Sequence, residues 1–373
     1  IQNVKEAAIV EDLDVYGVSN VTEVIEFFEG KGNLEPTRID TTEEFSKTLN
    51  FPEHDFADVK GQEGIKRCME IAAAGGHNII LIGPPGSGKT MLAKRLPSIL
   101  PPMTLHEALE TTKIHSVAGK IKDAGLMNQR PFRSPHHTAS SVSLVGGGSY
   151  PQPGEISLAH NGVLFLDELP EFKREVLEVM RQPLEDREVT ISRAKFTITY
   201  PSSFMLVASM NPSPGGYFND PDAPVSSSPA EMQRYLSKIS GPLLDRIDIH
   251  IEVTPVPFEK LTETRPAESS VLIRERVTKA REIQSQRFES FDSIHYNAQM
   301  GTKQIRQFCA LDETSLQLLK TAMERLNLSA RAYDRILKVS RTIADLEQSE
   351  RVNSNHIAEA IQYRSLDRDG WLG

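Results

Sequence analysis

The chain has 373 residues, of which 39% are hydrophobic and 25% are charged, as is typical of a soluble globular protein. That length predicts two or three domains with a core that folds without disulfides or structural metals. No apolar run approaches the ~20 residues that a membrane-spanning helix needs, and no signal-peptide pattern opens the chain, so we expect no membrane partner. The two cysteines, Cys68 and Cys309, lie far apart, which argues against a disulfide framework and fits a reducing, cytoplasmic setting.

The formal net charge of −9 is concentrated in one part of the chain. Residues 1–60 hold 14 Asp and Glu against 5 Lys and Arg, whereas residues 61–373 hold 37 of each kind. Because local patches set the electric field of a protein, this acidic balance does not exclude a nucleic-acid partner for the larger part of the chain.

The amino-terminal segment is interpreted as a remnant of another domain. The chain begins at Ile1 rather than Met, so we expect a piece of a longer protein. Residues 1–29 contain one apolar helical pattern, Val21–Phe28. Residues 30–55 carry glycines and prolines among acids, a composition typical of a linker.

Residues 56–257 alternate apolar strands with helical segments. Three continuous apolar runs have strand length: Ile79–Ile82, Val163–Leu166 and Phe204–Val207. Strands of this kind are buried on both faces of a parallel sheet. Beyond a proline-containing joint, residues 258–373 show helical periodicity instead. The expected fold is therefore α/β, a parallel sheet with helices on both faces, followed by an all-helical lid domain.

A phosphate-binding motif follows the first apolar strand. Its residues match the full P-loop pattern and are Gly83, Pro84, Pro85, Gly86, Ser87, Gly88, Lys89 and Thr90. The glycines let backbone N–H groups surround phosphate oxygens at the start of a helix. The amine of Lys89 reaches the β- and γ-phosphates, and the hydroxyl of Thr90 binds Mg²⁺. The motif predicts ATP and Mg²⁺ as cofactors.

Polar residues end the other two apolar strands. Asp167 and Glu168 follow the second strand, where Asp167 is the expected Mg²⁺ ligand and Glu168 can polarise the attacking water. An acidic pair after a strand is often only a solvated loop, but its place after a P-loop favours the catalytic interpretation, and the Glu favours hydrolysis. Asn211 follows the third strand, where it can orient water or simply form a turn before Pro212.

These elements, in this order, resemble the AAA+ ATPases, and further segments resemble the magnesium-chelatase-like proteins of the YifB/ComM competence family. The resemblance covers roughly residues 56–373. Besides the P-loop, its segments are Arg130–Thr138, Gly154–Glu168, Ser240–Asp248 and Leu328–Arg335. The Arg-Ser-Pro-His-His run in the first of these is more specific than the P-loop, which unrelated NTPases share. Residues 1–29 resemble the carboxyl end of the family's Lon-protease-like amino-terminal domain.

The resemblance implies roles for two arginines. Arg246 matches the arginine finger that reaches the nucleotide of a neighbouring subunit, where it stabilises charge on the γ-phosphoryl group. A plain ion pair with Asp245 or Asp248 is the alternative. Arg331 matches the second sensor arginine, and Arg335, one turn on, is its rival; a solvated helix face would explain either without a function. A finger supplied by a neighbour implies self-association into a ring, which we expect to be a hexamer.

Residues 113–150 are a candidate segment for contact with DNA. They contain five Lys and Arg, one Asp and three histidines, and they end in a glycine run. The resemblance identifies them as the helix-2 insert of this clade, which reaches toward the pore of the ring. The candidate contacts are Arg133, His136 and His137. Metal binding by the two adjacent histidines is disfavoured, because no carboxylate is spaced to join them.

A second candidate segment for DNA is residues 188–200. Alternating apolar residues flank a basic stretch, which predicts a hairpin with Arg193 and Lys195 at or beside its tip. Cations at such a tip can follow a phosphate backbone, although a charged tip is often only solvated. In DNA-handling relatives this hairpin lines the pore.

One departure from the family concerns the loop 212–229. Many relatives carry four cysteines there, whereas the corresponding positions here are Ser213, Gly215, Val225 and Ser227. No thiolate remains, so we expect no zinc.

The leading interpretation is an ATP-hydrolysing AAA+ ring motor acting on single-stranded or branched DNA, a helicase or branch-migration factor in natural transformation and recombination. The alternative is a protein-remodelling motor like the chelatase subunits, assisting metal insertion into a tetrapyrrole with the same fold and ATP site. A third hypothesis, an ATP-gated binding module with little turnover, is disfavoured because Glu168 and Arg246 are both present.

Overall fold

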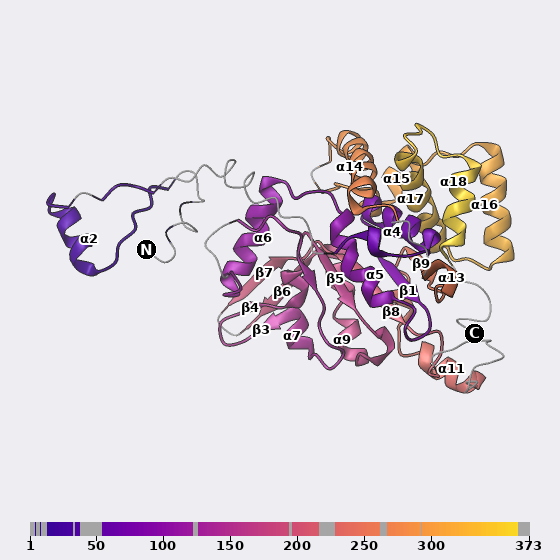
Figure 1. Cartoon of the computed structure of the whole chain (residues 1–373), viewed down its shortest axis with the longest axis horizontal. Coiled ribbons are helices and arrows are strands. Elements are labelled where there is room, and N and C mark those ends of the chain that lie inside the picture. The colour runs from indigo at the N-terminus through magenta and orange to yellow at the C-terminus, as the bar shows by residue number, and fades with distance from the viewer. Residues whose placement is uncertain are drawn as a thin grey trace. The chain divides into compact units, whose positions relative to one another are not determined.

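The computed structural model describes residues 13–32, 34–37, 54–121, 126–193, 196–215, 228–261, 267–291 and 293–364, together with Val4 and Ala8. The chain divides into a smaller unit, Ile1–Phe51 with Pro102–Arg130, and a larger unit, Pro52–Pro101 with Pro131–Gly373. Figure 1 shows the whole chain as a ribbon. Within the described ranges, no helix has the length and apolar character needed to cross a membrane.

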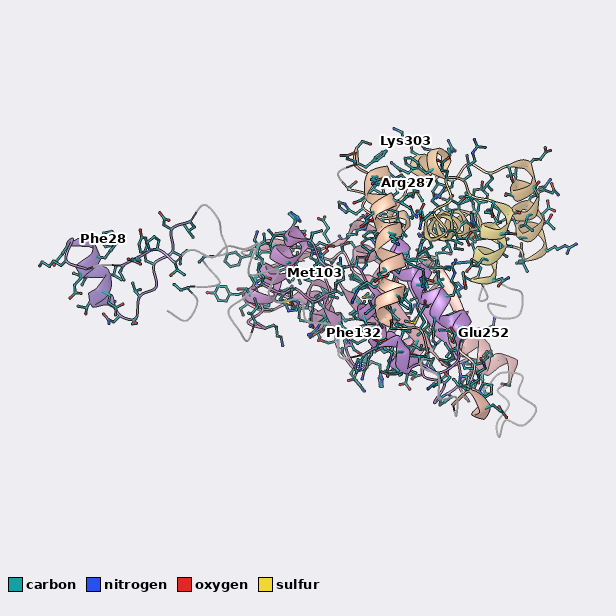
Figure 2. The ribbon with its side chains drawn as sticks, turned by 45° about the horizontal axis from the view of Figure 1, so that its top comes forward. Phe28, Met103, Phe132, Glu252, Arg287 and Lys303 are labelled. Atoms are coloured by element: carbon teal, nitrogen blue, oxygen red, sulfur yellow. The ribbon has the colours of Figure 1, made fainter. Side chains whose placement is uncertain are left out.

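The smaller unit contains α2 (Val21–Phe28) and α6 (Leu105–Val117). Each begins at a polar residue whose side chain accepts a hydrogen bond from the first turn, Asn20 for α2 and Thr104 for α6. The apolar face predicted for α2 is exposed; Phe28, labelled in Figure 2, has an exposed fraction of 83%.

A five-stranded parallel sheet forms the centre of the larger unit. Its strands lie in the order β2 (Phe132–Arg133), β5 (Val163–Leu166), β8 (Met205–Met210), β1 (Ile79–Ile82) and β9 (Ile249–Glu252). The three central strands are buried along their whole length, as continuous apolar runs predict. Ile82 lies opposite both Met210 and Glu252, so the carboxyl ends of β1, β8 and β9 meet at one edge of the sheet.

Helices cover both faces of this sheet. Successive strand residues alternate between two hydrophobic cores, with Ile79 and Leu81 in one and Ile80 and Ile82 in the other. The helices of the first core include α4 (Glu63–Gly75), α5 (Lys89–Arg95), α14 (Ser270–Arg287) and α17 (Ala330–Leu346). The helices of the second core include α8 (Glu155–Leu158), α9 (Arg174–Glu178), α11 (Pro229–Leu236) and α12 (Gly241–Leu244).

The carboxyl-terminal part of the larger unit is helical. Besides α14 and α17 it contains α13 (Phe258–Leu261), α15 (Thr302–Phe308), α16 (Glu313–Arg325) and α18 (Ser354–Gln362). Arg287 at the end of α14, labelled in Figure 2, binds the buried Asp345 of α17 at 2.7 Å. Because α14 and α17 both pack on α4, one hydrophobic core joins this helical region to the sheet. The predicted fold class is confirmed.

Two hairpins project from the sheet layer of the larger unit. The first pairs β3 (Gly146–Gly147) with β4 (Gln152–Pro153), between α7 (Ser141–Val145) and α8. The second pairs β6 (Glu188–Ser192), which follows α10 (Arg181–Asp186), with β7 (Thr197–Pro201), close to the predicted range 188–200. Lys195 lies outside the described residues. The short 3-10 helices are η1 (Phe56–Asp58), η2 (Leu96–Ile99), η3 (Leu169–Glu171) and η4 (Asn297–Gln299).

Residues 113–150, the range expected for the helix-2 insert, contain several short elements of secondary structure. That range holds the end of α6, the edge strand β2 and α7, so it is not a single loop. At the end of this range the β3–β4 hairpin separates two helices, α7 and α8, that pack on each other. Gly146, Gly147 and Gly148 have φ angles of +104°, +156° and +104°, which other residues rarely adopt, and this ends the helix at Val145.

Candidate active site

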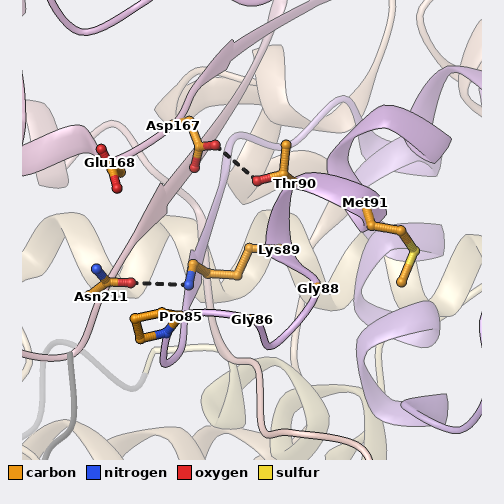
Figure 3. A pocket seen from close by; sticks show the side chains of 9 residues that line it. All are labelled: Pro85, Gly86, Gly88, Lys89, Thr90, Met91, Asp167, Glu168 and Asn211. Carbon is orange, nitrogen blue, oxygen red and sulfur yellow. Dashed lines mark hydrogen bonds between the residues drawn. The ribbon is translucent and has the colours of Figure 1, made fainter. Parts of the chain in front are cut away.

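The P-loop lies at the carboxyl edge of the sheet, between β1 and α5. The loop turns through Gly86 and Gly88, whose φ angles of +78° and +92° favour glycine. A cavity of about 370 Å³ lies beside it (Figure 3). The lining residues are Pro85, Gly86, Gly88, Lys89, Thr90, Met91, Asp167, Glu168 and Asn211. The structure therefore brings the predicted P-loop, acidic pair and Asn211 together.

Lys89 is held against the loop backbone. Its amine donates to the carbonyl oxygens of Gly83 at 2.6 Å and Pro84 at 2.9 Å, and to Oδ1 of Asn211 at 3.2 Å (Figure 3). Burial lowers the pKa of Lys89, against the opposing pull of the carboxylates of Asp167 and Glu168. The amine thus stands where phosphate oxygens would replace carbonyl oxygens as its partners.

Two buried oxygens beside the P-loop have no hydrogen-bond partner among the described residues: Oγ of Ser87 and Oε1 of Gln62. Gln62 donates from Nε2 to the carbonyl oxygens of Ser87 and Thr254, each at 3.1 Å. A buried polar atom without a partner is costly, so the hydroxyl of Ser87 fits a loop that binds phosphate. Gln62 was not identified from the sequence, because it precedes α4, outside the P-loop pattern.

Thr90 and Asp167 form the predicted cation site. Oγ1 of Thr90 donates to Oδ2 of Asp167 at 2.9 Å (Figure 3). The hydroxyl of Ser209 donates to the other carboxylate oxygen and accepts from the N–H of Glu168 at 3.2 Å. Hydroxyl and carboxylate oxygens are the hard ligands that Mg²⁺ prefers, so the pair fits this ion. Ser209 was missed from the sequence, where its only signal is a polar residue inside an apolar strand.

Glu168 has an unusual backbone conformation. It adopts the left-handed conformation, with φ 54° and ψ 52°, which costs a non-glycine residue about 1 kcal/mol or more. Its side chain is 54% exposed, so water can reach the carboxylate. Nδ1 of His137 lies 3.6 Å from Oε2 of Glu168, which brings the predicted His-His run to the edge of this site.

The other two candidate DNA contacts, Arg133 and His136, bind neighbouring residues of the chain. Arg133 donates two hydrogen bonds to Glu155, at 2.6 Å and 2.7 Å, a bidentate pair that neutralises its charge. Nδ1 of His136 lies 2.9 Å from Oγ1 of Thr138. Each of the three candidate DNA contacts, Arg133, His136 and His137, thus has a partner within the chain. Across the described ranges no cluster of three or more His, Cys, Asp and Glu could hold a metal ion.

Arg246 lies at the opposite edge of the sheet from the P-loop. Asn78 directly precedes β1, and its side-chain amide donates to the carbonyl oxygen of Arg246 at 2.9 Å. Arg246 therefore stands where β1 begins, whereas the P-loop starts where β1 ends. Its guanidinium pairs with Glu185 and donates to the carbonyl oxygen of Pro242 at 2.7 Å. The alternative ion pair with a neighbouring aspartate is not the one observed.

Arg331 and Arg335 of α17 lie at the same edge as Arg246. Arg331, whose side chain is 66% exposed, binds the carboxylate of Asp245. Arg335 pairs with the buried Asp248 at 3.0 Å and donates to the carbonyl oxygen of Asp245 at 3.2 Å. Neither arginine lines the cavity of Figure 3, so both sensor candidates stand apart from the P-loop of their own chain.

Comparison with known proteins finds two family models that together match most of the chain. The family model described as "Magnesium chelatase, subunit ChlI" matches residues 55–261, and "Magnesium chelatase, subunit ChlI C-terminal" matches residues 267–364. Competence protein ComM of Haemophilus influenzae is 46% identical over 98% of this chain and 71% of its own length. The uncharacterized protein YifB of Escherichia coli is 47% identical over 92% of this chain and 66% of its own length. The uncharacterized protein YifB of Salmonella typhimurium is 42% identical over 98% of this chain and 70% of its own length.

The strand order, the P-loop after β1 and the acidic pair after β5 define an AAA+ ATPase. The family matches and the identity along the chain go further: the chain belongs to the magnesium-chelatase-like family of these ATPases, together with ComM and YifB. The predicted resemblance is confirmed, and the family implies use of ATP and Mg²⁺. The chain spans 66% to 71% of the length of these three relatives.

Proposed function

We propose that this chain is an ATP-hydrolysing ring motor that acts on single-stranded or branched DNA, in transformation and recombination. The name of the Haemophilus influenzae relative, a competence protein, supports the pathway. We place the activity in the cytoplasm, in keeping with the two buried, free thiols of Cys68 and Cys309.

The observation that supports a ring motor most directly is the separation of Arg246 from the P-loop. The two stand at opposite ends of β1, whose four residues span about 13 Å, and the guanidinium of Arg246 binds groups at its own end. An arginine finger in this chain is therefore aimed away from its own nucleotide. A second copy, placed head to tail, would supply the missing arginine, and such an interface closes into a ring when the rotation allows; we expect a hexamer.

Within this assembly each residue has a separate task. Lys89, Thr90 and Asp167 would hold the nucleotide and Mg²⁺. The positive charges of Lys89 and Mg²⁺ would neutralise the charge of the phosphates. Glu168 would orient water and accept its proton. The neighbour's Arg246 would stabilise the charge that spreads over the γ-phosphoryl oxygens in the transition state.

The DNA part of the proposal is supported by the β6–β7 hairpin. Residues 189–203 contain no Asp or Glu, and the side chain of Arg193 forms no ion pair with a described residue. A cation in an acid-free segment can follow a phosphate backbone, and this kind of binding weakens steeply with salt.

The test reverses two charges in this hairpin. Arg193→Glu combined with Lys195→Glu should leave basal ATP hydrolysis within a few-fold of the parent and abolish its stimulation by single-stranded DNA. DNA affinity, measured at two salt concentrations, should fall and lose most of its salt dependence. Lys320→Glu with Arg325→Glu, both exposed on α16, is the matched control and should change neither. Unchanged affinity and salt dependence in the hairpin variant would remove this hairpin from the DNA path.

The second candidate is a protein-remodelling motor, favoured by the magnesium chelatase description of both family models. Such a motor would use the same ATP site, but its substrate would not need to be a polyanion. Hydrolysis that no DNA stimulates, in a parent protein that forms rings, would support it over the DNA motor.

A further inference from the structure

The β3–β4 and β6–β7 hairpins meet side by side. The guanidinium of Arg193 lies over the backbone of Gly147, where a Cβ atom would come within 2.8 Å of Nη2. The hydroxyl of Tyr200 on β7 donates to the carbonyl oxygen of Pro151 at 2.9 Å. The rings of Tyr150 and Phe196 complete the junction, with 6.3 Å between their centroids. Two segments that are some 40 residues apart in sequence thus form one surface.

Both rings of this junction face water. Tyr150 is 75% exposed and Phe196 is 46% exposed, whereas Tyr200 below them is buried. Val142, on α7 beside Gly147, is 54% exposed and extends the apolar area. Large aromatic side chains are usually buried. A group of them exposed together at the surface is typical of a binding site.

The two chain segments that carry the rings contain no acidic residue. Residues 140–154 and 189–203 contain no Asp or Glu, while Arg193 contributes a guanidinium between the hairpins. Arg193 donates to the carbonyl oxygen of Ser192 at 3.2 Å and forms no ion pair with a described carboxylate. The surface therefore offers flat apolar faces and an available cation, the combination that suits an anion carrying aromatic rings.

We propose that Tyr150, Phe196 and Arg193 form a stacking platform for the bases of a single-stranded nucleic acid. The inference rests on the proposed function, and it narrows the proposed substrate from single-stranded or branched DNA to strands with unpaired bases and assigns the residues that bind those bases. Aromatic rings stack on any base, so they bind without regard to sequence, and a guanidinium contacts a phosphate or stacks beside the rings. In a duplex the base faces are covered by their neighbours, so the platform selects single strands.

Hydrogen bonds hold the backbone that carries the platform before any ligand binds. The turn that carries Tyr150 follows Gly148, whose φ of +104° favours glycine, and the hydrogen bond from Tyr200 holds Pro151, the next residue after the ring. On the other hairpin, the N–H of Arg193 donates to the carbonyl oxygen of Phe196 at 2.7 Å, which positions the second ring. A backbone held in this way loses little freedom on binding.

The experiment compares three labelled ligands of equal length by fluorescence anisotropy on the full chain: oligodeoxythymidine, the same backbone without bases, and a duplex. The parent should bind oligodeoxythymidine at least tenfold more tightly than the abasic strand. Tyr150→Leu with Phe196→Leu, which keeps apolar area but removes the rings, should bring the two affinities together. Tyr150→Trp with Phe196→Trp should retain the difference, and Leu316→Ala, exposed on α16, should not affect it.

The outcomes separate this inference from the proposed function. A leucine double variant that still prefers strands with bases would overturn the platform. A parent that binds the abasic strand equally well would also overturn it, yet leave the DNA motor standing. A parent that binds none of the three ligands would refute the DNA motor itself, and the platform with it. If the leucine variant instead loses self-association in sedimentation, the rings belong to an interface between copies, and the platform is wrong.

Discussion

At the carboxyl edge of the sheet the cavity is lined by a lysine, a threonine and two carboxylates, whereas the amino edge carries arginines. The lining of the first cavity includes no arginine, and a smaller cavity of about 60 Å³ at the amino edge is lined by Arg187, Arg246 and Arg335 among others. For phosphoryl transfer, the carboxyl edge has the lysine and the carboxylates but no arginine in its cavity, and the amino edge has the arginines. The difference supports our proposal that the hydrolytic site is divided between copies of the chain, and each prediction below acts on one edge.

The largest effect is expected at the amino edge. Arg246→Ala should lower ATP hydrolysis about a thousandfold, because a finger arginine stabilises charge only in the transition state. Nucleotide affinity should stay within a few-fold of the parent, since no arginine lines the P-loop cavity. Phosphate release and binding of a fluorescent ATP analogue measure the two quantities. Arg325→Ala, exposed on α16, serves as control, and equal loss of ATP affinity and turnover in the Arg246 variant would break the comparison.

The next effect lies at the carboxyl edge. Glu168→Gln should lower hydrolysis about a hundredfold while ATP and Mg²⁺ still bind, because an amide cannot accept a proton from water. Glu171→Gln, three residues on and partly exposed, should hydrolyse ATP like the parent. Parent-like turnover by the Glu168 variant would assign the water-polarising role to another residue.

A third prediction concerns what holds the amino edge together. Burial alone would raise the pKa of Asp248, but Arg335 and the hydrogen bond with His77, at 2.9 Å, hold it well below its ordinary value. Because the folded pKa lies below the unfolded one, this stabilisation is present above about pH 4 and is lost as the pH falls further. Asp248→Asn should lower the free energy of unfolding at pH 7 by about 3 kcal/mol, since it leaves Arg335 without its buried partner.

Urea denaturation at pH 7 and at about pH 2, below the unfolded pKa of an aspartate, measures this effect, with Glu350→Gln, exposed after α17, as the control. The difference between parent and variant should shrink as the pH falls. A difference that is the same at both pH values would show that the charge of Asp248 contributes nothing.

The smallest effect returns to the carboxyl edge. Ser209→Ala removes the hydroxyl that bonds the carboxylate of Asp167 and the N–H of Glu168. Residues that orient a cation ligand commonly change metal affinity by about tenfold or more, so half-maximal hydrolysis should need about tenfold more Mg²⁺. A Mg²⁺ titration of the ATPase rate measures this, and an unchanged midpoint would reduce Ser209 to a packing residue.

Residues at the carboxyl edge were predictable because their signals are local. The P-loop, the acidic pair and Asn211 each follow an apolar strand directly, and parallel strands bring their carboxyl ends together. Gln62 and Ser209 were missed, because a single polar residue outside a motif gives no pattern.

The amino edge was harder to predict, because it is assembled from segments far apart in sequence. Arg331 meets Asp245 only through the packing of α17 on α4, which no local pattern shows. The two-residue strand β2 is too short to show a hydrophobic period, so the sequence does not predict it. The His137–Glu168 contact depends on the same edge strand.

The divided site is tested most directly by mixing two inactive proteins. Glu168→Gln chains keep Arg246, and Arg246→Ala chains keep Glu168, so a ring built from both contains interfaces in which one copy supplies each group. We expect the mixture to regain hydrolysis, with a maximum near equal amounts and at most about a quarter of the parent's sites complete. No activity at any mixing ratio, in rings shown by sedimentation to contain both chains, would contradict the division of the site between copies.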